Sequence, residues 1–301
     1  MDFDLLTTSR LLSERGLGPA GIRRSMASGE LARIRRGVYG LKRGDVRADH
    51  HELIAATTPL LAPGTVVSHT SAAVLHGLPV QRTLLGRLWV IRGDSNGGTR
   101  RILTASDASL REDEIVEIDG IRVTSLARTV VDLARTRPFD WGVVAADSAL
   151  RLGLSRDAMD WALDSARGFP GVRRARTVVG LADARAESPG ESRSRAVMFL
   201  KGVPAPELQF EISCNGAFVA RTDFAWPQFR TVGEFDGRVK YTGELSQGQA
   251  AEQVLFEEKQ REQRLRDAGW WFVRWGWRDL AHPEDLARRL SRAFELAPMA
   301  A

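Results

Sequence analysis

The chain has 301 residues, of which 43% are hydrophobic and 27% are charged, and its formal net charge is +5. This composition supports folded cores and excludes a disordered chain, and no apolar run approaches the ~18 residues that a membrane span needs. The single cysteine, Cys214, excludes an internal disulfide and a cysteine-based zinc site. The opening MDFDLLTTSR lacks the basic flank and apolar run of a signal peptide, so we expect a cytoplasmic protein without a membrane partner.

All of the excess positive charge lies in residues 1–47. These residues hold ten basic and five acidic side chains, whereas the remaining 254 residues carry equal numbers of both signs. A basic terminal module on a neutral body favours an anionic partner, of which nucleic acid is the simplest.

Residues 1–47 predict a small helical unit followed by a turned strand pair. Leucines at near-helical spacing predict a first helix, and a glycine- and proline-containing break at 16–19 separates it from a second helix at about 19–27. Alternating residues 31–34 and the glycine-containing stretch 35–40 predict the strand pair. This order is typical of a winged helix-turn-helix.

Residues 48–185 predict a middle α/β region. Its expected helices and strands are separated from the rest of the chain by a glycine- and proline-containing stretch at 168–190. We expect helices at about 49–62, 71–78, 126–135, 141–152 and 155–166, and strands at 88–91 and 118–124.

Residues 186–301 predict a third domain, which makes the whole an α+β multidomain protein. Asn215-Gly216 is a strong hairpin signal between two alternating stretches. The expected order is one helix, three antiparallel strands, a long charged helix, a fourth strand and a last helix, at about 191–201, 208–214, 217–225, 230–236, 252–268, 270–275 and 283–296.

Acidic residues in this third domain predict a metal site. Asp223 falls on the second strand and Glu234 on the third, and a pairing of Asp223 with about Val232 would bring both carboxylates within reach of one cation. Glu191 on the preceding helix could add another oxygen. Mg²⁺ prefers oxygen ligands, and it could polarise a scissile phosphate and activate the attacking water.

A positive side chain would complete such a catalytic site. Lys240, just past the third strand, or Lys259 on the long helix could stabilise the charge that develops on the phosphate. The alternative is purely structural, with the two strand acids paired to Arg221 and Arg230 on neighbouring strands.

Five short motifs in this domain carry a family resemblance. They are Glu191-Ser-Arg-Ser-Arg, Arg221-Thr-Asp-Phe-Ala-Trp-Pro227, Glu234-Phe-Asp-Gly237, Glu258-Lys259-x-Arg261 and Gly269-Trp-x-x-x-Arg274. Over about 187–282 the chain resembles the restriction-endonuclease-like domains of the very-short-patch-repair (Vsr-like) type, in the PD-(D/E)xK nuclease superfamily. The resemblance implies that Asp223 and Glu234 bind the metal, with Glu191 as a helix-borne acid. The chain departs from the pattern at Asp236, where the superfamily has lysine.

A second resemblance covers about residues 1–150. Its motifs are Leu31-Ala-Arg-Ile-Arg-Arg-Gly-Val-Tyr39, Ser68-His-Thr-Ser-Ala-Ala-Val-Leu-His-Gly77 and Thr124-Ser-Leu-Ala-Arg-Thr-Val-Val-Asp-Leu133. They are similar to the AbiEi-type antitoxins of type IV toxin–antitoxin systems, which implies a winged helix that represses its own operon and a cognate nucleotidyltransferase-type toxin. The resemblance places Arg23 and Arg24 on the recognition helix and Arg33, Arg35 and Arg36 at the wing. The alternative for these arginines is a solvated basic face.

Other candidate residues are better explained by packing. His69 and His76 are seven residues apart without an evident third ligand, so with Ser68 they are expected to pack helices. Tryptophans 226, 270, 271, 275 and 277 are expected in the core and rim of the sheet, although aromatic rings can also stack on bases.

The sequence therefore leads to three functional hypotheses. The first is an AbiEi-like antitoxin or transcriptional regulator whose nuclease fold serves binding to double-stranded DNA. The second is a Mg²⁺-dependent DNA endonuclease targeted by its winged helix. The third is a protein-interaction module that neutralises a toxin through the middle region.

Overall fold

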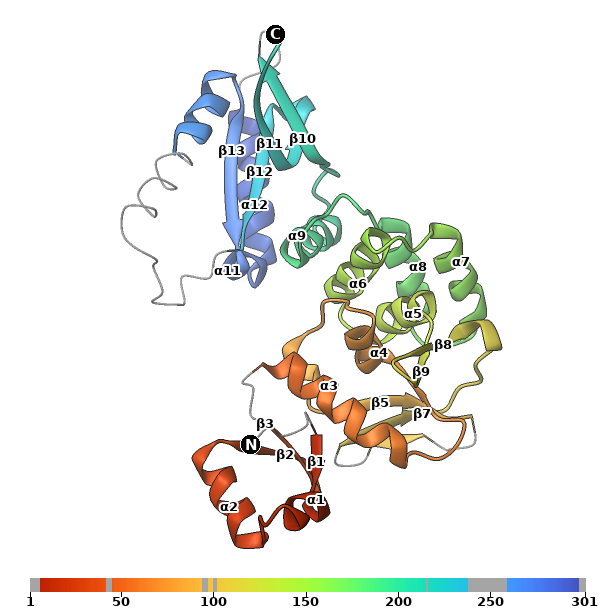
Figure 1. Cartoon of the computed structure of the whole chain (residues 1–301). Coiled ribbons are helices and arrows are strands. Elements are labelled where there is room, and N and C mark those ends of the chain that lie inside the picture. Colours follow the sequence, from red (N-terminus) through yellow and green to blue (C-terminus); the bar gives the residue numbers. More distant parts are fainter. Residues whose placement is uncertain are drawn as a thin grey trace. The chain divides into compact units, whose positions relative to one another are not determined.

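The computed structural model describes residues 6–41, 45–93, 97–99, 102–214, 216–237 and 259–297. The chain is an α+β multidomain protein, and its contacts divide it into two compact units (Figure 1). The N-terminal unit comprises 1–137 and 153–180, and the C-terminal unit comprises 138–152 and 181–301. Within the described ranges, every helix is too short or too polar to cross a membrane.

The first part of the N-terminal unit contains the predicted helices and strand pair. A third strand, which was not anticipated from the sequence, precedes these elements. Residues 6–8 are extended and pair with the second strand of the predicted pair, which we call the β2–β3 ribbon, so that the sheet order is β1-β3-β2. The elements are β1 (Leu6–Thr8), α1 (Ser9–Glu14), α2 (Pro19–Ser28), β2 (Leu31–Arg35) and β3 (Val38–Leu41).

A small core holds these elements together. Leu12 of α1, Ile22 of α2 and Leu31 of β2 are buried against one another, with Leu17 and Tyr39 packed around them. These apolar side chains turn inward together, which leaves the polar side of α2 in solvent.

The rest of the N-terminal unit is a six-stranded mixed sheet with helices around it. The strand order is β6-β7-β5-β4-β9-β8, and β5 pairs parallel with β7 as β4 does with β9. Its strands are β4 (Val66–Val67), β5 (Leu88–Ile91), β6 (Gly98–Thr99), β7 (Leu103–Ser106), β8 (Ile115–Ile118) and β9 (Ile121–Thr124). Its helices are α3 (Val46–Thr57), α4 (His69–Leu75), α5 (Leu126–Thr136), α7 (Arg156–Ser165) and α8 (Val172–Leu181).

Two expectations for this region were wrong. The single strand expected at 118–124 is a hairpin, because Asp119 and Gly120 both have positive φ (51° and 75°) and turn the chain between β8 and β9. The stretch at 168–190, expected as a separator, contains α8, whose buried Ala175, Val178 and Val179 pack into the unit.

The C-terminal unit is a four-stranded sheet, in the order β10-β11-β12-β13, with helices on both faces. The first three strands are antiparallel neighbours, and β12 pairs parallel with β13. Its elements are α6 (Phe139–Arg151), α9 (Pro189–Leu200), β10 (Glu207–Cys214), β11 (Ala217–Trp226), β12 (Thr231–Asp236), a helix over 259–267, β13 (Trp271–Gly276), α11 (Trp277–Leu280) and α12 (Pro283–Leu296).

Alternation along β11 assigns its side chains to two cores. Phe224 and Trp226 pack with Trp275 and with α9 and α12 on one face, whereas Ala225 packs on the other face with Leu265 of the helix over 259–267. The expectation that Trp226 and Trp275 belong to the sheet core is confirmed, because both are fully buried.

The pairing of β11 with β12 differs from the expected register. Val232 lies opposite Ala225 rather than Asp223, because Pro227–Phe229 form a 3₁₀ turn and Arg230 has a left-handed φ of 44°, so the connection takes four residues. Phe224 pairs with Gly233, and one further step in this register sets Asp223 opposite Glu234. The correction thus brings the two predicted acids closer than the expected pairing would.

Candidate functional sites

The three predicted acids of the C-terminal unit lie on neighbouring elements, Glu191 in the first turn of α9, Asp223 on β11 and Glu234 on β12. Ser188 caps α9 by accepting a hydrogen bond from the Glu191 backbone N–H at 3.1 Å. Gly190 lies so close to β12 that a Cβ there would overlap the ring of Phe235. The close approach that glycine permits therefore places the Glu191 carboxylate next to the strands.

Glu191 is fixed by hydrogen bonds to one of its oxygens. Its Oε2 accepts from the Glu187 backbone N–H at 2.8 Å and from Nε2 of Gln209 at 3.0 Å. Burial raises the pKa of Glu191, and the negative charges of Asp223 and Glu187 raise it further. Protonation, or a cation, would relieve this repulsion.

Asp223 bridges the two strands. Its Oδ2 accepts a hydrogen bond from the backbone N–H of Phe235 at 2.9 Å. Burial raises the pKa of Asp223, and the charge of Glu234 adds to the rise while Arg261 opposes it. Such raised carboxyl pKa values are common at functional sites, although structural networks produce them as well.

Glu234 forms ion pairs with two arginines. Arg261 pairs with its Oε1, and Arg274, its register partner on β13, lies 3.4 Å from its Oε2. Lys259 is exposed on the helix over 259–267, and Lys240 lies outside the described residues. Among the residues that the structure describes, the positive charges paired with Glu234 are guanidinium groups, and the role predicted for the lysines stays a prediction.

The structural alternative named the wrong arginines. Arg221 pairs with Glu187 at 3.0 Å, and Arg230 packs over the ring of Trp270 and donates to the Ala268 carbonyl at 3.2 Å. Both therefore take part in other interactions, and the pairing of a strand acid with arginine is made by Arg261 and Arg274 instead.

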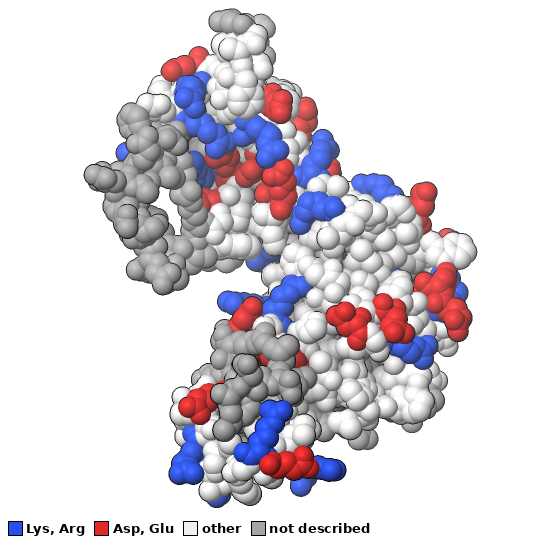
Figure 2. Space-filling view, viewed as in Figure 1, with Lys and Arg blue, Asp and Glu red and all other residues white. Residues whose placement is uncertain are grey.

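Among the described residues, no three His, Cys, Asp or Glu side chains are grouped closely enough to hold a metal ion. Figure 2 shows acidic and basic side chains next to one another on the surface of the C-terminal unit. Magnesium binding by Glu191, Asp223 and Glu234 thus stays a prediction.

Gln209 is a site residue that was not anticipated from the sequence. It lies between the register pairs Leu208–Phe224 and Phe210–Thr222, which sets it opposite Asp223, and its φ is +52°. A positive φ at a non-glycine residue stores backbone strain, and strained backbone clusters at functional sites. Its only sequence signal was a polar position in an alternating strand, which has no specificity.

The predicted DNA-contacting arginines lie on one small module of the N-terminal unit. Arg23 and Arg24 are exposed on α2, immediately after the buried Ile22. Arg33 on β2 and Arg36 in the ribbon turn are also exposed. Arg35, the remaining predicted arginine, is the last residue of β2, and its side chain lies outside the described part of the structure.

His69 and His76 are packing residues, as expected. His76 Nε2 lies 2.7 Å from the Thr124 carbonyl oxygen, and His69 is 4% exposed with its Nδ1 3.0 Å from Ser68 Oγ. Burial lowers the pKa of His69 to about 4, so the ring is neutral at pH 7.

These features define an α+β multidomain protein with an exposed basic module and an enclosed carboxylate cluster. No protein-family model matches the chain. It is similar to two Mycobacterium tuberculosis proteins, named Uncharacterized protein Rv2248 and Uncharacterized protein MT2308. Each is 29% identical over 275 residues, which cover 91% of this chain and 96% of the relative. The similarity therefore extends through both units.

Proposed function

We propose that the chain binds double-stranded DNA through α2 and the β2–β3 ribbon and acts as a transcriptional regulator of the AbiEi type. The observation that carries the proposal is the exposure of Arg23, Arg24, Arg33 and Arg36 on a module whose apolar side is occupied by its own core.

Exposed arginines are suited to this role because they need no rearrangement before meeting a phosphate. A helix fits the major groove of B-DNA, and a neighbouring β-ribbon can reach the backbone or the minor groove. Each neutralised phosphate releases counterions, so affinity falls with salt. We expect Arg23 and Arg24 to approach base edges or phosphates, and the ribbon arginines to contact the backbone.

The ion pairs at Glu234 favour regulation over cleavage for the C-terminal unit. Arg261 and Arg274 already balance the acid to which the Vsr-like resemblance gives the metal. A nuclease fold with an internally neutralised site can serve binding, either of DNA or of a nucleotidyltransferase-type toxin made from the same operon.

Replacement of the ribbon arginines tests the DNA-binding proposal. The double variant Arg33→Gln plus Arg36→Gln should weaken binding of the full chain to a DNA duplex taken from upstream of the protein's own gene. The affinity of this variant should also depend less steeply on salt concentration. Arg167→Gln is the control, because Arg167 is exposed on the same unit and pairs with Asp164 at 2.8 Å. Equal affinity and equal salt dependence for the ribbon variant, the control and the wild type would refute a role for the ribbon.

A Mg²⁺-dependent endonuclease is the second candidate, favoured by the raised pKa values of Glu191 and Asp223. Their oxygens are of the type that Mg²⁺ prefers, and the ion would polarise a phosphate there. Arg261 would have to leave Glu234 for all three acids to serve as ligands.

Nicking of supercoiled plasmid tests this candidate. Wild type should nick with Mg²⁺ and not with EDTA, Asp223→Asn should not nick, and Glu211→Gln, an exposed β10 control, should nick normally. Equal nicking by wild type and Asp223→Asn, or none by either, would exclude a nuclease at this site.

A further inference from the structure

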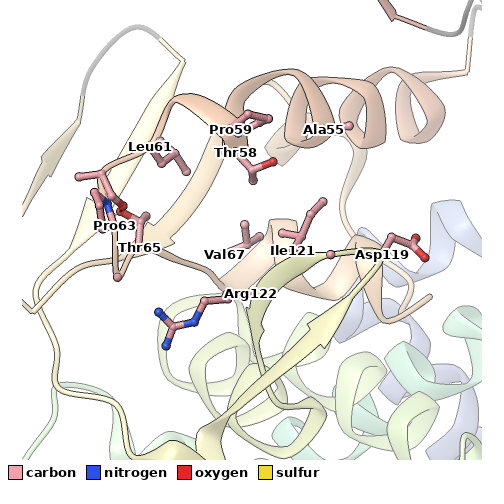
Figure 3. Close-up of a pocket in the computed structure, with 13 residues that line it drawn as sticks. Ala55, Thr58, Pro59, Leu61, Pro63, Thr65, Val67, Asp119, Ile121 and Arg122 are labelled. Carbon is pink, nitrogen blue, oxygen red and sulfur yellow. The ribbon is translucent and has the colours of Figure 1, made fainter.

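Two cavities of similar size occur in the N-terminal unit. The first, of about 550 Å³, lies between the end of α3 and β9 (Figure 3). Its wall combines apolar side chains, among them Pro59, Leu61 and Ile121, with polar ones, and the charged ends of Asp119 and Arg122 point away from one another. Its polar groups do not converge, so it does not define a ligand.

The second cavity, of about 510 Å³, is lined by three arginines. Arg128 and Arg135 come from α5 and Arg174 from α8. His69, Ser106 and the aromatic residue Phe169 also line it. A volume of this size suits a small organic ligand rather than a single ion.

Arg128 has a buried donor that nothing in the described ranges satisfies. Its residue is 1% exposed; Nε donates to Asp132 at 2.9 Å and Nη1 to Glu114 at 3.1 Å. Its Nη2 is buried without a hydrogen-bond partner among the described residues. An unsatisfied buried donor is costly, and more so on a charged group, so a hydrogen bond to an oxygen at this position would stabilise the folded state.

Arg135 repeats the pattern about two turns further along α5. Its side chain is 9% exposed; Nη2 donates to Asp132 at 2.7 Å and Nη1 to the Pro170 carbonyl at 2.9 Å. Its Nε is likewise buried and lacks a partner within the described part of the chain. Two neighbouring guanidinium groups thus each keep one donor unused.

The third arginine and Phe169 complete the cavity. Arg174 is exposed, and its Nε donates to the Ala134 carbonyl at 3.1 Å. The guanidinium carbons of Arg128 and Arg135 lie 5.7 and 5.0 Å from the ring centre of Phe169, so the ring and the cations form one surface.

Backbone strain adds a second, independent indication. His69 lines the cavity with φ +49°, a conformation that is uncommon for a non-glycine residue and is concentrated at ligand-binding sites. Gly171 has φ +83°, and a Cβ there would overlap the Arg135 carbonyl, so the 168–171 loop is held tightly against α5.

We propose that this cavity binds a phosphorylated small molecule, a phosphomonoester whose phosphate contacts Arg128, Arg135 and Arg174. Planar guanidinium groups match phosphate oxygens, and several of them suit a dianion. The organic part would lie against Phe169 and Ile91, and Asp107 at the cavity could accept from its hydroxyl groups. This binding site is independent of the DNA-binding proposal.

Calorimetric titration of the full chain tests the site with AMP, adenosine and inorganic phosphate as probes. AMP and phosphate should bind, and adenosine should bind at least about tenfold more weakly than AMP because it lacks the charged group. Arg174→Gln should weaken AMP binding by about tenfold. Arg173→Gln is the matched control, since Arg173 is an exposed neighbour on α8 that does not line the cavity.

A variant that fills the cavity tests the site without removing any of its charged side chains. Ser106→Phe should abolish AMP binding while circular dichroism reports an unchanged fold, because the ring occupies the ligand volume. Equal binding of AMP and adenosine, equal affinities of Arg174→Gln and Arg173→Gln, or no binding of AMP would each overturn the proposal.

Discussion

The two units place their charged groups in opposite ways. The module formed by residues 6–41 of the N-terminal unit exposes Arg23, Arg24 and Arg36 to solvent. The C-terminal unit instead encloses Glu191, Asp223 and Glu234 among hydrogen bonds and ion pairs. Exposed charges cost little to keep and are ready for a polyanion, but enclosed carboxylates raise the free energy of the folded state unless something balances them. The number of charges alone therefore does not show which of them can reach a ligand, because that also depends on their exposure.

Acidification should cause the largest difference in stability between the two units. The pKa of His69 falls from 6.5 to about 4 on folding, so its contribution to stability is present above pH 6.5 and is lost as pH falls toward 4. Integrated over this window, the N-terminal unit should lose about 3 kcal/mol.

The measurement is chemical denaturation of wild type and His69→Asn between pH 7 and 4. Asparagine tolerates positive φ, so the variant removes the titration with less backbone strain. The slope with pH should shrink in the variant but not in the exposed control His51→Asn, while buried His50 and half-buried His76 keep a residual slope. Identical slopes for all three proteins would contradict the assignment.

The second largest effect should come from a single methyl group at the start of α9. Gly190→Ala forces a Cβ into the ring of Phe235, and overpacking of this kind costs about 1–3 kcal/mol. Gly180→Ala is the matched helical control; its Cβ meets no described atom within 4 Å, and alanine should stabilise α8 by up to about 1 kcal/mol. If both variants unfold at the same denaturant concentration, the close approach of α9 to β12 is wrong.

Replacement of Glu234, the acid paired with two arginines, should cost more stability than replacement of an exposed arginine in the N-terminal unit. Glu234→Gln leaves Arg261 and Arg274 without their carboxylate and should cost about 1 kcal/mol, a modest figure because both arginines are about a third exposed. Arg23→Gln, on the exposed helix, should change stability by less than about 0.5 kcal/mol. Denaturation midpoints compare the two, and equal losses would remove the distinction between enclosed and exposed charge.

The smallest effect has the opposite sign. Because burial raises the folded pKa values of Asp223 and Glu191, ionisation lowers stability as pH rises through the window between their unfolded and folded pKa values. Asp223→Asn and Glu191→Gln should therefore raise the midpoint of thermal unfolding at pH 7 and leave it nearly unchanged at pH 3. A lower midpoint at pH 7 for both variants would show that the carboxylates are structural.

The sequence predicted the local elements better than their partners. Asn215-Gly216 and the alternating residues on either side predicted the β10–β11 hairpin, since turn chemistry and side-chain period are local signals. The β11–β12 register was wrong by two residues, because neither signal shows that Pro227–Phe229 form a 3₁₀ turn.

The partners of Glu234 depend on contacts that no local pattern encodes. Arg274 reaches it through the parallel pairing of β12 with β13, and Arg261 through a helix that lies between these strands in the chain. Both arginines fall within the motifs of the Vsr-like resemblance, but the sequence did not predict that they pair with Glu234. The exposed arginines of α2 were easier to predict, because an amphipathic helix exposes whatever is not apolar.

The most direct test of the central claim measures DNA binding by the exposed helix. Fluorescence anisotropy of a labelled duplex, titrated with the full chain from 50 to 200 mM salt, compares wild type with Arg23→Gln plus Arg24→Gln and with the control Arg167→Gln. We predict about tenfold or greater loss of affinity for the double variant, and a salt slope smaller by about 0.9 for each phosphate that is no longer neutralised. Wild-type affinity and slope in the double variant would contradict this claim.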